Sequence, residues 1–133
     1  MIYINNIDEL IETLSEGKHS ALLSSKKKND IPIMPYYSYS PAVHELIISV
    51  RKFDADHPEI DFPNNKQMAE QYGICWDNED TILNADVSVM DGIAIMALLS
   101  TIIRKEKLHD GFIQKAINHG TIDTCLKKLK EEE

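Results

Sequence analysis

Apolar residues recur at steps of three and four along most of this chain, the spacing typical of α-helices that bury one face. Residues 7–16 carry four apolar side chains in this arrangement, with Asn6 as a possible cap and Gly17 as a stop. The next such segment, 41–53, follows Ser40, a residue type that caps helices well, and begins with a proline that suits the first helical turn. Both segments are predicted to be amphipathic helices packed on a common core.

The segment 88–106 differs from the others because nearly every residue from Gly92 to Ile103 is apolar. A helix that is apolar on all sides is buried, so we expect the stretch from Met90 to Ile103 to be enclosed by the rest of the chain. Asp86 or Ser88 is the expected cap, and Ser88 with Asp91 has the spacing of a capping box. The basic residues that follow, Arg104, Lys105 and Lys107, are favoured at the negative end of the helix dipole.

Three further helices are predicted, over 65–72, 110–119 and 121–130, with a frayed tail at 131–133. Gly73 and Gly120 are their expected stops. At 133 residues, without internal repeats or a dividing linker, the chain is expected to form one compact all-α domain.

One segment, 31–41, breaks the helical pattern with three prolines and three tyrosines. We interpret it as an extended, ordered loop. Its tyrosines, Tyr36, Tyr37 and Tyr39, either pack against the core with their hydroxyls near water or face a partner.

The net charge of −8 is concentrated in the middle of the chain, where residues 54–103 hold ten acidic residues and one basic residue. Such a surface does not suit duplex nucleic acid, which is bound through Lys and Arg. It is either a solvated surface or a contact face for a protein partner. The candidate contact residues here are Asp54, Asp56, Glu59, Asp61 and Trp76, and Trp76 is also interpreted as a core-edge residue before a helix cap.

The pair His109–Asp110 has the form of a dyad in metal-dependent phosphohydrolases of the HD kind. The further ligands would be His44 or His57 upstream and Asp123 downstream. The pair, however, lies at the expected start of a helix, where Asp110 or His109 would act as the cap. We therefore predict no metal and no cofactor, and keep the metal-dependent hydrolase as an alternative.

The segments YYSYSPAVHELIISV (36–50) and ADVSVMDGIAIMALLSTIIRKEKLHDGFIQKAINHGTIDTCLKKLK (85–130) resemble a bacterial domain family of unknown function. The family pattern has an acidic-capped apolar helix, then IxRxxRFxxG, then two short helices with a glycine between them. The matching positions are Ile103, the basic Lys105–Lys107 region, Leu108, Gly111, Gly120 and Leu126. Lys107–Leu108 replaces the family's Arg-Phe, which puts a functional arginine there in doubt. The resemblance implies a helical bacterial domain, often near mobile elements, and implies no activity.

The remaining features concern location and cysteine chemistry, and they exclude some classes of protein without assigning an activity. The N-terminus has no basic and apolar signal-peptide pattern, and no apolar stretch is long enough to span a bilayer, so we expect a cytoplasmic protein. Cys75 and Cys125 are expected to be free thiols, at least one of them buried. The predicted function is a small non-enzymatic interaction or regulatory protein, a bacterial or phage accessory factor. The alternative binding role is an acidic mimic that blocks a nucleic-acid-binding protein.

Overall fold

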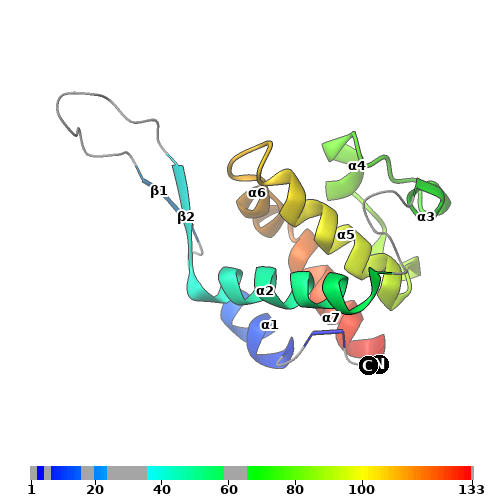
Figure 1. Ribbon diagram of the computed structural model, residues 1–133, viewed down its shortest axis with the longest axis horizontal. Coiled ribbons are helices and arrows are strands. Elements are labelled where there is room, and N and C mark those ends of the chain that lie inside the picture. The colour runs from blue at the N-terminus through cyan, green and yellow to red at the C-terminus, as the bar shows by residue number, and fades with distance from the viewer. Residues whose placement is uncertain (1–2, 5–6, 16–19, 24–35, 59–65, 133) are drawn as a thin grey trace.

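The computed structural model describes residues 3–4, 7–15, 20–23, 36–58 and 66–132, which form a helical domain with one projecting hairpin (Figure 1). The elements in order are α1 (Ile7–Ser15), β1 (Ser20–Leu23), β2 (Tyr36–Tyr39), α2 (Pro41–Asp56), α3 (Lys66–Gln71), α4 (Glu79–Leu83), the 3-10 turn η3 (Val87–Val89), α5 (Gly92–Lys105), α6 (Phe112–His119) and α7 (Thr121–Glu132). The all-α prediction is confirmed, because helices supply the core.

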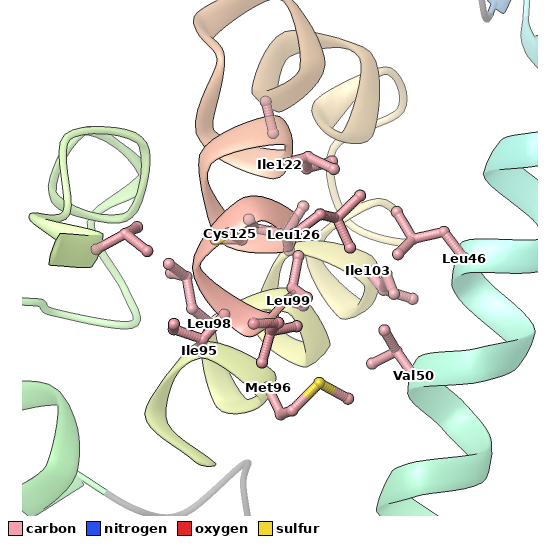
Figure 2. Packing of buried hydrophobic residues seen from close by; sticks show 14 of the residues in the cluster. Leu46, Val50, Ile95, Met96, Leu98, Leu99, Ile103, Ile122, Cys125 and Leu126 are labelled. Carbon is pink, nitrogen blue, oxygen red and sulfur yellow. The ribbon is translucent and has the colours of Figure 1, made fainter. Parts of the chain in front are cut away.

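Helix α5 lies at the centre and is wrapped by α2, α6 and α7, while α1 packs on α2 and α7 (Figure 1). Met90 and most of α5 as far as Ile103 are buried, as the apolar run predicts. Figure 2 shows α7 on one side of α5, with Ile122, Cys125 and Leu126 turned toward it, and α2 on the other, with Leu46 and Val50. Each of these apolar side chains contributes about 1.5–3 kcal/mol when it is fully removed from water.

The predicted start of the central helix was wrong. Asp86 caps only η3, where its carboxylate accepts from the Ser88 amide at 3.2 Å. Met90 is then extended (ψ 143°), and Asp91 is the cap of α5, accepting from the Ala94 amide at 2.8 Å. Two Asp residues five positions apart therefore each cap their own turn, and the expected Ser88–Asp91 capping box does not form.

Helix α2 begins as predicted, with Ser40 accepting from the Val43 amide and Pro41 in the first turn. Five apolar residues of this helix are buried, and it continues to Asp56, three residues beyond the predicted end. Helix α7 also runs further than predicted, to Glu132. Lys128 pairs with Glu131 at 3.7 Å and with Glu132 at 3.6 Å, and these contacts support the last turn in place of the expected fraying.

The segment predicted as an extended loop contains β2, which pairs antiparallel with β1 from Ser20↔Tyr39 to Leu23↔Tyr36. The two strands project from the helical body (Figure 1). The sequence did not predict this pairing, because the partner strand is distant along the chain and only four residues long. Residues 31–35 of the predicted loop lie outside the described part of the chain.

Candidate functional site

A cavity of about 400 Å³ lies between α2 and the C-terminal half of α5. Its walls carry both apolar and charged side chains. The lining residues are Val50, Arg51, Asp54, Ser100, Ile103, Arg104 and Lys107.

Helical periodicity explains why these side chains converge. On α2, Arg51 and Asp54 are three residues apart, and on α5 Ser100 and Arg104 are four apart, so each pair lies on one face of its helix. Lys107 follows Arg104 by three residues and lies just after the end of α5, where its amide donates to the Arg104 carbonyl. Val50 and Ile103, both buried, supply the apolar part of the lining.

Asp54 connects the two helices across the cavity. Its Oδ2 accepts a hydrogen bond from the Ser100 hydroxyl at 2.7 Å and lies 3.6 Å from Nη2 of Arg104. Its Oδ1 is buried without a hydrogen-bond partner. Ser100 is only 1% exposed, one of two buried polar side chains among the described residues, and this contact with Asp54 satisfies it.

The charge of the cavity is opposite to that of the chain. Arg51, Arg104 and Lys107 line it, and Asp54 is its single acidic residue. Among the residues that the structure describes, Asp54 pairs with Arg104, whereas Arg51 and Lys107 make no ion pair. Guanidinium groups bind carboxylates and phosphates through two parallel hydrogen bonds, so this lining can hold an anion.

Beside the cavity, Glu106 joins three segments. Its carboxylate accepts from the Tyr39 hydroxyl at the end of β2, from the Gly111 amide, and from the Ile113 amide at 3.3 Å. Burial, followed by the hydrogen bond to Glu106, raises the pKa of Tyr39 well above its usual range. Tyr39 packs against the core, as one of the two interpretations of the tyrosine segment predicts, but its hydroxyl donates to Glu106 in place of the expected contact with water.

This carboxylate replaces the predicted cap of α6. Gly111, not Asp110 or His109, is the N-cap, with a left-handed backbone (φ 92°) and no side-chain cap. Glu106, the residue that follows α5, accepts from the amides of the cap residue Gly111 and of Ile113 in the first turn. Sequence reasoning missed this because it considered only residues next to the helix start.

The proposed His109–Asp110 dyad is differently engaged. Nδ1 of His109 lies 2.9 and 3.0 Å from the two carboxylate oxygens of Glu79 on α4, so the histidine ties the α5–α6 junction to α4. Asp110 is exposed. Within the described part of the chain, no three or more His, Cys, Asp or Glu residues gather in a way that can hold a metal ion.

The other predicted contact residues are dispersed. Asp54 faces the cavity and Asp56 is exposed at the end of α2, while Glu59 and Asp61 lie outside the described residues. Trp76 packs against the core, as predicted, and its indole N–H is buried without a hydrogen-bond partner. The backbones of Tyr36 and Tyr37 lie on β2, and whether either tyrosine meets a partner stays a prediction.

The cysteines are both free, as expected, but their environments differ. Cys75 is exposed, whereas Cys125 is fully buried on α7, and burial raises the pKa of its thiol to about 12. A thiol that stays protonated and enclosed is a packing residue and not a nucleophile.

The comparison with protein families decides one further point. The sequence matches the Family of unknown function (DUF6508) over residues 3–133. The chain belongs to the DUF6508 family. The match covers the N-terminal half as well as segments 36–50 and 85–130, so the whole helical domain is the DUF6508 unit. No curated protein and no solved structure matches this chain.

A search for membrane-spanning helices in the described part of this DUF6508 chain found none of sufficient length and apolar character. The expectation of a cytoplasmic location stays a prediction.

Proposed function

We propose that this DUF6508 protein is a small non-enzymatic binding protein that takes an anionic group of its partner into the cavity between α2 and α5. One observation carries the proposal. Arg51, Arg104 and Lys107 converge on a single cavity, opposed only by Asp54, in a chain whose net charge is −8. The chain has 14 Lys and Arg residues against 22 Asp and Glu, so the convergence of three cations on one cavity supports a binding role.

The chemistry of the lining supports binding and not catalysis. The Ser100 hydroxyl is hydrogen-bonded to a carboxylate, and the described lining contains neither a histidine nor a cysteine. Covalent catalysis requires a nucleophile with a free general base beside it, whereas the Asp54 carboxylate next to Ser100 also pairs with Arg104. The binding protein is favoured over the metal-dependent hydrolase because His109 is engaged by Glu79 and no group of ligands gathers around it among the described residues.

The partner is proposed to be a protein, with the hairpin as a second contact. A two-stranded hairpin has unpaired edges and little stability of its own. The β1–β2 hairpin projects from the helical body (Figure 1), and β2 carries Tyr36, Tyr37 and Tyr39. We propose, as an extension of this role, that the protein is a cytoplasmic accessory factor of a bacterium or phage.

The experiment is an NMR titration of ¹⁵N-labelled protein with sodium phosphate at constant ionic strength. Amide shifts are expected to cluster at residues 50–54 and 100–107. Arg104→Gln should weaken binding about tenfold, which corresponds to ~1.4 kcal/mol, within the range for a hydrogen bond to a charged group. Lys105→Gln is the matched control, because Lys105 is adjacent on α5 and does not line the cavity.

A second matched pair is Arg51→Gln against Lys52→Gln on α2. Binding should fall in the first variant of each pair and stay within twofold of wild type in the second. Equal losses in both members of each pair, or shifts scattered over the surface, would show that only the overall charge attracts the anion. Either result would refute the proposed function.

A further inference from the structure

We infer that the preferred occupant of the α2–α5 cavity carries a doubly charged phosphate monoester and not a singly charged carboxylate. This inference rests on the proposed function and specifies its ligand. It follows from the number of positive charges that the cavity leaves uncompensated.

The ion pairs of the charged side chains that line the cavity show which positive charges are compensated. Asp54 lies 3.6 Å from Arg104 and offsets it. Arg51 and Lys107 line the same cavity without an acidic partner among the described residues, so two positive charges stay uncompensated. A phosphate monoester carries about −1.5 to −2 charges at pH 7, whereas a carboxylate carries one.

The surroundings strengthen this preference. Val50 and Ile103, which are 1% and 6% exposed, form the apolar part of the lining. Arg51, Arg104 and Lys107 are themselves exposed, so the ligand would meet them near the protein surface, where charges still interact more strongly than in bulk water. A volume of about 400 Å³ accommodates a phosphate together with part of the group that bears it.

A longer polyanion is disfavoured. A nucleic-acid backbone needs a row of cations to neutralise successive phosphates. Here the cations are confined to one cavity, and the exposed residues Glu45 and Asp56 on the same helix are acidic. The geometry therefore points to a single phosphate group.

The test compares phenyl phosphate with phenyl sulfate by isothermal titration calorimetry at pH 7.5. The two probes have nearly the same shape, but the phosphate is a dianion and the sulfate ester a monoanion. We expect phenyl phosphate to bind at least tenfold more tightly. At pH 5, where the phosphate has gained a proton, its advantage should fall below threefold.

Variants separate this inference from the proposed function. Lys107→Gln removes one uncompensated charge, so it should bring the phosphate-to-sulfate affinity ratio below threefold, while Lys105→Gln should keep the ratio. If both probes bind equally well to the wild type and lose affinity in Arg104→Gln, the cavity binds anions and the dianion preference is wrong. If neither probe binds, the proposed function itself fails.

The source of the phosphate is assigned by two further ligands, a short neutral peptide containing phosphoserine and adenosine monophosphate. Binding of the phosphopeptide more tightly than phenyl phosphate supports a protein segment as the bearer. Tighter binding of adenosine monophosphate assigns the phosphate to a nucleotide, which supports the dianion preference and overturns the protein partner proposed above. Affinities equal to that of phenyl phosphate mean that the phosphate alone is recognised, which also supports the inference. Exclusion of both, with phenyl phosphate still bound, would show that the cavity does not admit a biological monoester and would overturn it.

Discussion

The two long sides of α5 are packed in different ways. Toward α7 the interface is apolar and closed, with Cys125, Leu126 and Leu129 all fully buried. Toward α2 it begins with similar apolar contacts through Leu46 and Val50 (Figure 2) and then opens into the cavity lined by charged side chains. Helix α5 thus has one side, toward α7, that stabilises the domain and another, toward α2, that presents charged side chains to solvent.

The largest expected effect tests the closed side. Leu126→Ala should lower the free energy of unfolding by about 3 kcal/mol, because a fully buried leucine leaves a cavity that its neighbours fill only in part. Urea unfolding followed by circular dichroism measures this. Ile48→Ala, at a position 66% exposed on α2, should change stability by less than about 0.5 kcal/mol. A similar cost for both substitutions would show that Leu126 is not enclosed between α7 and its neighbours.

The next effect uses the buried thiol on the same side. The folded protein holds the Cys125 proton up to a pKa of about 12, whereas an unfolded chain releases it near pH 8.5. The resulting stabilisation is therefore complete below the unfolded pKa and is lost as the pH rises toward the folded pKa. The advantage of wild type over Cys125→Ala should shrink by about 1.4 kcal/mol per pH unit above pH 9.

Unfolding in urea at pH 8, 9.5 and 10.5 provides the measurement. Cys75→Ala is the control, because it makes the same substitution at an exposed position outside the core. A constant difference between wild type and Cys125→Ala across these pH values would show that the thiol is not enclosed.

The smallest effect on stability concerns the open side. Asp54→Asn removes a charge whose Oδ1 has no partner but keeps an oxygen that can accept from Ser100. Unfolding free energy should change by less than about 1 kcal/mol. Affinity for phosphate should rise severalfold, because the one negative charge of the cavity is gone. Weaker phosphate binding in a variant of normal stability would show that Asp54 positions Arg104 for the anion and does not compete with it.

The sequence predicted the closed side much better than the open one. Burial leaves a periodic trace, so the core helices and their apolar faces were predicted nearly in full. Errors occurred where two polar groups competed for one role, as Asp86 and Asp91 did at the start of α5. They also occurred where a partner was distant in sequence, as for β1 and β2.

The cavity left a weaker signal in the sequence, and its basic residues were interpreted as charges at a helix end. Arg104 and Lys107 were assigned to the dipole at the end of α5, and Arg51 was not singled out. Spacings of three and four among Ser100, Arg104 and Lys107 do indicate one face, but they do not reveal that α2 brings Arg51 opposite them. Convergence of side chains from two helices depends on their packing, which a single sequence does not encode locally.

The carboxylate of Glu106 couples the local opening of two parts of the molecule. It is the common acceptor for Tyr39 of the hairpin and for the amides of Gly111 and Ile113. Groups that share one acceptor lose their protection from hydrogen exchange together when that acceptor moves away. The amide protons of Gly111 and Ile113 should therefore exchange in deuterated solvent at rates that depend on the docking of the hairpin. A ligand that binds the hairpin would then slow amide hydrogen exchange at the start of α6, more than sixty residues away along the chain.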